Sequence, residues 1–129
     1  MTVELKYLAW SIVLGLVYVL VATLLSNSQR GLNWNVSNRD GTPPPLTGAA
    51  ARAHRATRNF LETFPFFAAA VLAVVLAKGG TAQTAMGAML YFWGRALYLP
   101  VYVIGIPYLR TLVWAVAFVG LLRVLLGLF

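Results

Sequence analysis

Long apolar segments constrain the fold of this chain more than any other feature. The first, Tyr7 to Leu25, has nineteen residues without a charge, which is enough to cross a bilayer as a helix. Only helices and closed barrels cross membranes, and these segments lack the alternation of a strand. We therefore predict an all-α integral membrane protein, a four-helix up-down bundle. It forms a single domain over residues 1–129, with spans at about 5–26, 48–77, 81–104 and 108–128.

Composition supports the membrane class and excludes several kinds of site. The chain is 60% hydrophobic and only 10% charged, whereas a soluble domain carries about a quarter charged residues. The formal charge of +7 does not predict a nucleic-acid partner, because no basic run is interleaved with aromatic residues. There is no cysteine, so the chain has no thiol nucleophile, and its one histidine, His54, gives no basis for a metal site.

The basic residues predict an orientation in the membrane. In an up-and-down bundle, one end collects most of the arginines and the other end only three basic residues. The first group is Arg30, Arg39, Arg52, Arg55, Arg58, Arg95 and Arg110, and the second is Lys6, Lys78 and Arg123. By the positive-inside rule, the arginine-rich end faces the cytoplasm and both termini lie on the opposite side.

Three polar groups are expected to meet at the arginine-rich end, and ionisable residues inside a membrane are by default functional candidates. The groups are Arg55, Asn59 and Glu62; Arg95, Tyr98 and Tyr102; and Arg110 with Thr111. Spacings of three and four residues keep the first two groups each on one helix face. Arginines bind carboxylates through paired hydrogen bonds, and a glutamate can hold an ammonium group. This combination suits a small zwitterion with more than one carboxylate.

The same residues resemble a known family. The pattern Arg55-Ala-x-x-Asn59-x-x-Glu62-x-x-Pro65-x-Phe67 is similar to the second-helix signature of the MAPEG superfamily, the membrane-associated proteins of eicosanoid and glutathione metabolism. The stripe Arg95-x-x-Tyr98-x-x-x-Tyr102, followed by Arg110, resembles the third and fourth helices of that family. Thr63 stands where some eicosanoid-forming members carry tyrosine. The loop at residues 38–40 resembles bacterial members, which implies a bacterial inner membrane.

The resemblance implies a homotrimer that binds glutathione, as cosubstrate, between neighbouring subunits on the cytoplasmic side. Arg55, Asn59, Glu62, Arg95, Tyr98 and Tyr102 would then bind glutathione, Thr111 would supply a hydroxyl group, and Arg110 would be catalytic, facing the sulfur. Arginine near a thiol favours the thiolate. The implied function is a glutathione transferase or peroxidase acting on lipophilic electrophiles or lipid hydroperoxides.

Other interpretations remain open at the level of the sequence. The polar residues of the second helix could form only an interhelical network, with Glu62 neutralised by Arg55 or Arg95. Tyr98 and Tyr102 could belong to an interfacial aromatic belt. Two other functions are compatible with the chain: a non-catalytic, lipid-binding accessory protein of the same superfamily, and a small transporter. A transporter is disfavoured because the second span beyond Pro65 and the third span before Arg95 carry no charged residue.

Overall fold

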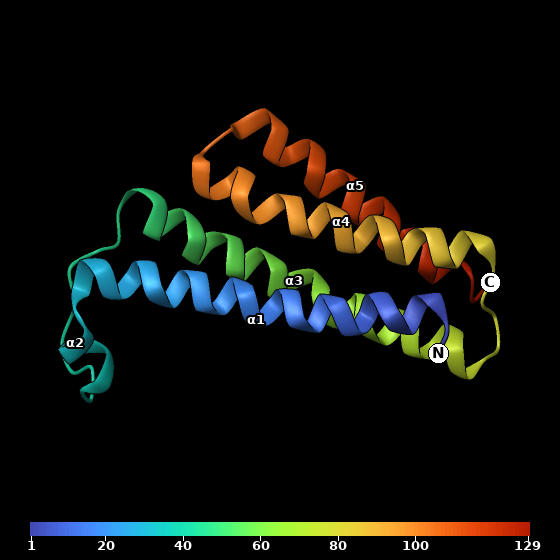
Figure 1. The fold of residues 1–129 in the computed structure, drawn as a ribbon, viewed down its shortest axis with the longest axis horizontal. Coiled ribbons are helices and arrows are strands. Elements are labelled where there is room, and N and C mark those ends of the chain that lie inside the picture. Colours follow the sequence, from blue (N-terminus) through green and yellow to red (C-terminus); the bar gives the residue numbers. More distant parts are fainter.

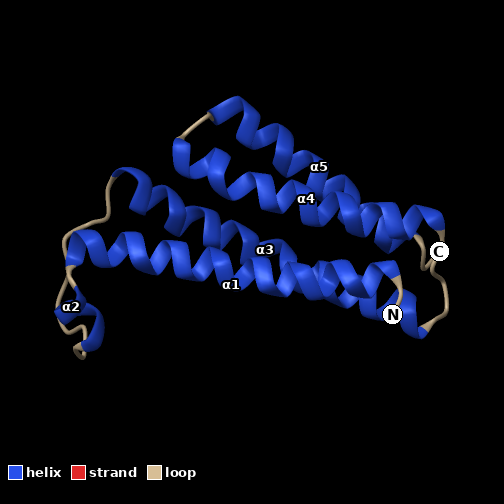
Figure 2. Cartoon of the chain, in the orientation of Figure 1, coloured by secondary structure: helices blue, strands red, loops and turns tan.

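The computed structural model describes residues 1–129 and consists of helices joined by short connections (Figures 1 and 2). The helices are α1 (Val3–Arg30), α2 (Leu32–Val36), α3 (Gly48–Leu76), α4 (Ala82–Ile104) and α5 (Pro107–Leu126). Three of them, α1, α3 and α5, are long and apolar enough to cross a membrane. The prediction of an all-α fold is therefore confirmed, and the three apolar helices support an integral membrane protein.

The four long helices alternate in direction, so both termini lie at one end of the molecule (Figure 1). Helix α1 packs against α3 and α4, and α5 also packs against α3 and α4, but α1 and α5 do not touch each other. Helices α1 and α5 therefore occupy opposite corners of the structure. We call the end with the N- and C-termini the terminal end, and the other end, where α2 lies, the loop end.

The connection between α1 and α3 is more ordered than a turn-rich loop would suggest. Helix α1 continues to Arg30, about one turn past the expected limit of the first span, and Gly31 ends it with a φ of +88°. The Gln29 side chain then makes two hydrogen bonds with the Thr47 backbone, at 2.8 and 3.0 Å, and Arg30 donates to the Pro44 carbonyl. These bonds hold the loop against the end of α1 and set the start of α3.

Helices α4 and α5 approach each other closely because glycines line their contact. A Cβ added at Gly94 would lie 2.8 Å from the Ala117 nitrogen, and one added at Gly87 would lie 2.6 Å from the Gly120 carbonyl oxygen. Small residues at a helix contact let the backbones approach and are typical of membrane helices. Helices α4 and α5 are therefore closely packed along their length.

Buried hydrophobic side chains form two clusters, one toward each end of the molecule. The cluster at the terminal end is almost wholly apolar and consists of Leu8, Phe67, Ala70, Val71, Val74, Ala88, Tyr91, Ala117, Leu121 and Val124. The cluster at the loop end is richer in tyrosine and consists of Tyr18, Ala56, Phe60, Tyr98, Leu99, Tyr102 and Val113. The second cluster surrounds the polar residues singled out in the sequence.

Candidate functional site

Arg95 is the centre of the polar cluster at the loop end. Its side chain is completely buried, and its Nη1 donates a hydrogen bond of 2.8 Å to the Asn59 Oδ1 on α3. Its guanidinium carbon lies 4.4 Å from the centre of the Tyr98 ring, 5.4 Å from that of Phe60 and 5.8 Å from that of Tyr18. Aromatic faces attract such a cation, more strongly where water is excluded. Arg95 therefore reaches Asn59 from inside an aromatic cage.

Tyr102 lies between two other arginines. Its hydroxyl oxygen accepts a hydrogen bond of 3.1 Å from Arg55 Nε on α3, and the Arg110 guanidinium carbon lies 4.7 Å from the centre of its ring. Tyr98 packs edge-on against Tyr102, with ring centres 5.4 Å apart. One tyrosine thus holds guanidinium groups from α3 and α5 close to each other without a carboxylate between them.

Arg52 anchors the end of α4 beside this cluster. Its Nε donates a hydrogen bond of 2.9 Å to the carbonyl of Val103, one of the last carbonyl groups of α4, which have no partner within the helix. The chain then turns at Gly105, whose φ of +95° favours glycine, and α5 begins at Pro107. This turn places Arg110 in the first turn of α5, next to Tyr102.

Two small cavities adjoin these arginines, and Arg110 lines both. One, of about 210 Å³, is lined by Asn59, Tyr98, Arg110, Thr111 and Trp114. The other, of about 260 Å³, is lined by Arg52, Arg55, Tyr102, Gly105, Ile106, Pro107 and Arg110. Cationic groups and hydroxyl groups therefore dominate the polar walls of both cavities, and such walls suit an anionic ligand.

Comparison with known proteins decides the family of this chain. Residues 7–129 match the MAPEG family, so the match includes α3, α4, α5 and nearly all of α1. The chain belongs to the MAPEG family. No individual curated protein matches it. Membership identifies the chain as a membrane protein of the superfamily associated with eicosanoid and glutathione metabolism, in agreement with the resemblance of its motifs.

The MAPEG motif residues are distributed unequally around the cavities. Asn59, Tyr98, Arg110 and Thr111 line the smaller cavity, and Arg55 and Tyr102 line the other. Arg95 lines neither, because Tyr98 and Asn59 are among its nearest neighbours and it has no exposed surface. The structure therefore gives Arg95 contacts that orient other site residues, and no open path to a ligand.

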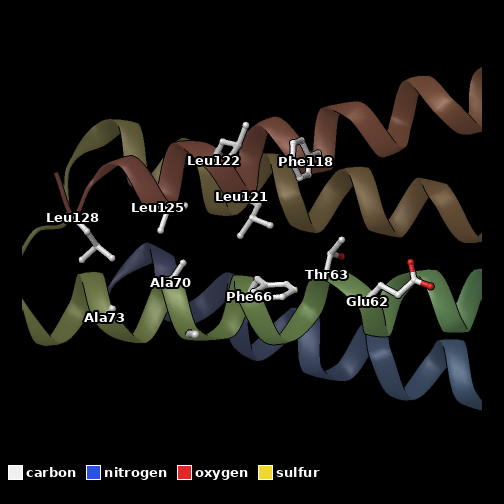
Figure 3. Close-up of a pocket in the computed structure, with 11 residues that line it drawn as sticks. Glu62, Thr63, Phe66, Ala70, Ala73, Phe118, Leu121, Leu122, Leu125 and Leu128 are labelled. Carbon is white, nitrogen blue, oxygen red and sulfur yellow. The ribbon is translucent and has the colours of Figure 1, made fainter.

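Glu62 takes no part in the hydrogen bonds of this cluster. Arg95 binds Asn59 and Arg55 binds Tyr102, so the alternative in which one of these arginines neutralises Glu62 is not what the structure shows. Glu62 lies instead, with Thr63, at one end of a groove between α3 and α5 (Figure 3). The groove has a volume of about 650 Å³, and nine of its eleven lining residues are hydrophobic.

The sequence did not indicate that Tyr18 and Phe60 are neighbours of Arg95. Tyr18 is fully buried, its hydroxyl group donates a hydrogen bond of 2.5 Å to the Arg95 carbonyl, and its ring lies 4.6 Å from that of Phe60. The only sequence signal for Tyr18 was a tyrosine in the middle of an apolar span, far from the membrane boundary where tyrosine is typical. Phe60 lies within the polar motif, between Asn59 and Leu61, but a phenylalanine there carries no polar group that would mark it as a site residue.

Proposed function

We propose that this MAPEG protein is a glutathione-dependent membrane transferase or peroxidase that acts on lipophilic substrates. The observation that carries the proposal is the position of Arg110, which lines both small cavities and stacks on Tyr102. An arginine in the first turn of a helix opposes the positive end of the helix dipole. An anion bound there is favoured by the guanidinium, by the dipole and by the free N–H groups.

Glutathione fits the charges at this end of the molecule. It carries two carboxylates and one ammonium group; the cluster offers several arginines, and Glu62 in the α3–α5 groove offers one carboxylate. In the proposal, Arg55, Asn59, Tyr98, Tyr102 and Thr111 bind its polar groups, and Glu62 pairs with its ammonium group. Arg95 contributes by holding Asn59 in place through the 2.8 Å hydrogen bond. Arg110 lies next to the glutathione sulfur in this proposal.

The chemistry follows from the charge of Arg110. A free thiol has a pKa of about 8.5, and a nearby cation lowers it and so raises the thiolate fraction at neutral pH. The thiolate forms a carbon–sulfur bond with an electrophile as the leaving group departs with the bonding electrons. With a hydroperoxide, two glutathione molecules are oxidised to the disulfide while the peroxide is reduced to an alcohol and water. Both reactions use a nucleophile that the cysteine-free chain lacks.

We further propose that the protein works as a homotrimer of four-span subunits, with the site between subunits. Trimerisation would bring a neighbouring subunit to the loop-end cavities and to the groove where Glu62 lies. In this arrangement α4 spans the membrane together with α1, α3 and α5. The loop end faces the cytoplasm of a bacterial inner membrane, and the termini lie on the other side.

A transport function has less support from the packing. A transport path would continue through the terminal half of the bundle, but that half is filled by a cluster of ten buried residues, all apolar except for the tyrosine hydroxyl of Tyr91. That hydroxyl group is already hydrogen-bonded to Thr63 at 3.1 Å. The experiment below distinguishes the catalytic function from the non-catalytic lipid-binding function.

The test is glutathione binding to the detergent-purified protein, with ultraviolet absorbance of the thiolate at neutral pH. Arg110→Ala is expected to lose the thiolate signal and to lower kcat/KM toward a lipophilic electrophile by about 100-fold or more, as for removal of one charge-stabilising group. In this variant the rate should rise with pH toward the free-thiol pKa of about 8.5, because deprotonation then limits the reaction. The rate of the unsubstituted protein should already be independent of pH at neutral pH.

Arg58→Ala is the matched control, because Arg58 is an exposed arginine of the same polar stretch of α3 and lines none of the cavities described above. It should keep both the thiolate signal and the turnover. Unchanged turnover in Arg110→Ala would remove Arg110 from the mechanism. If the unsubstituted protein binds glutathione without a thiolate signal, the accessory function is favoured. If it does not bind glutathione, the glutathione-dependent function is wrong and the arginines serve helix packing.

A further inference from the structure

A second cleft lies on the opposite face of the molecule from the α3–α5 groove, between α1 and α4 at the terminal end. It has a volume of about 530 Å³ and is lined by Val3, Lys6, Tyr7, Trp10, Phe92 and Trp93. Its aromatic side chains contact one another: the rings of Tyr7 and Phe92 are 5.6 Å apart, and those of Phe92 and Trp93 are 5.1 Å apart. None of these residues belongs to the candidate glutathione site.

The cleft is graded from polar to apolar along the membrane normal. Lys6 lies in the first turn of α1, near the membrane boundary, whereas Trp93 lies eleven residues into α4. The ring of Tyr7, the residue after Lys6, lies 5.6 Å from that of Phe92, so α4 reaches this level only at residues 92 and 93. Along α1 the cleft extends from Lys6 to Trp10, which is about 6 Å at 1.5 Å per residue. The cleft therefore has a cation at its outer edge and aromatic rings about one helical turn deeper.

The large aromatic residues of the cleft are left uncovered by the rest of the chain. Trp10 and Trp93 both line the cleft, and their side chains are 59% and 53% exposed. In a membrane protein such surface is covered by lipid or by another protein. A lipid whose headgroup lies level with Lys6 would place the first part of an acyl chain against these rings.

The charge at the terminal end indicates which lipid headgroup would bind there. Lys6 and Lys78 are exposed and Arg123 is half-buried at this end. The one acidic residue, Glu4, is buried and accepts a hydrogen bond of 2.5 Å from the Thr84 hydroxyl group. Of the basic residues at this end only Lys6 lines the cleft, so the accessible charge in the cleft is positive, which favours an anionic headgroup.

We propose that the α1–α4 cleft binds one membrane phospholipid with a net negative headgroup. Its phosphate pairs with the Lys6 ammonium group, and one acyl chain lies along Trp10, Phe92 and Trp93. The site is independent of the proposed glutathione chemistry, because it uses different residues at the opposite end of the bundle. It gives the protein a lipid ligand in the leaflet away from the candidate active site.

Fluorescence quenching by brominated lipids tests this proposal. A reporter protein with Trp34→Phe and Trp114→Phe retains only Trp10 and Trp93, both in the cleft. It would be reconstituted in vesicles of brominated phosphatidylcholine to which brominated phosphatidylglycerol is added at equal chain composition. We expect the anionic lipid to bind the quenching site about fivefold more strongly than the zwitterionic lipid, the effect of about one basic residue.

The matched pair of variants is Lys6→Gln and Lys78→Gln, both made in the reporter. Each removes one exposed lysine from the terminal end, but only Lys6 lines the cleft. Lys6→Gln should abolish the preference for anionic lipid, and Lys78→Gln should keep it. If both variants lose the preference for anionic lipid equally, the preference comes from general surface charge and the proposal is overturned. Protection of Trp10 and Trp93 from both lipids would overturn it as well, because a protein neighbour would then cover the cleft.

Discussion

Tyr18 connects α1 to the polar cluster through a single hydroxyl group. Because its OH donates to the Arg95 carbonyl at 2.5 Å from a completely buried position, Tyr18→Phe removes one buried hydrogen bond while leaving the ring in its packing. A bond of this kind contributes about 1 kcal/mol to the free energy of unfolding. We expect a loss of about that size, measured by denaturant titration in detergent. Tyr7→Phe, which alters a half-buried ring with no hydrogen bond to its hydroxyl group, should cost less.

Sequence spacing predicts which residues share a helix face, but not which residues pair between helices. Spacings of three and four residues place Asn59 on the face of α3 that carries Arg55, and place Tyr102 on the face of α4 that carries Arg95. The pairs that form, Arg95 with Asn59 and Arg55 with Tyr102, cross between helices and depend on how α3 and α4 pack. Spacing within one helix does not contain that information. The functional roles of these residues stay predictions.

At the scale of the helices, the contact between α4 and α5 depends on glycine. A Cβ at Gly120 would lie 2.5 Å from the Gly87 carbonyl oxygen and 2.6 Å from the Tyr91 nitrogen, and both of these are backbone atoms. Gly120→Ala should therefore force the helices apart and lower the free energy of unfolding by about 1–3 kcal/mol, as overpacking does. The measurement is again denaturant titration in detergent.

Gly15→Ala on α1 is the comparison for this prediction. Its Cβ would meet the edge of the Phe60 ring at 2.9 Å, and a side chain can move more easily than a backbone. It should therefore be the milder of the two substitutions. If Gly120→Ala is tolerated as well as Gly15→Ala, the close approach of α4 and α5 does not limit stability.

The long helices follow from their apolar composition, whereas the connections do not. Long, predominantly apolar segments predict helices in a membrane because every backbone group must be hydrogen-bonded internally. The extension of α1 to Arg30 and the short α2 (Leu32–Val36) depend on other contacts. The Gln29 side chain binds the Thr47 backbone eighteen residues away, a pairing that no local pattern encodes. The polar composition of this segment indicated a loop but not the bonds that order it.

At the scale of the whole molecule, the distribution of arginine predicts which end faces the cytoplasm. The chain has no cysteine, so single cysteines can report on each end without a background. Ser37 lies in the loop after α2, Lys78 lies in the turn between α3 and α4, and Tyr108, which is 91% exposed, lies at the start of α5. In intact cells, a membrane-impermeant maleimide should label Lys78→Cys and leave Ser37→Cys and Tyr108→Cys unlabelled.

Tyr108→Cys carries the decisive part of this experiment, because it tests whether α4 crosses the membrane. Helix α4 contains the buried Arg95 and is the one long helix that is not apolar enough to be identified as a span by composition. Arg95 is shielded from lipid by Tyr18, Phe60 and Tyr98, so its charge does not prevent α4 from crossing. All three cysteines should react after the cells are permeabilised. Labelling of Tyr108→Cys together with Lys78→Cys in intact cells would mean that α4 begins and ends on the same side, and would contradict the four-span arrangement.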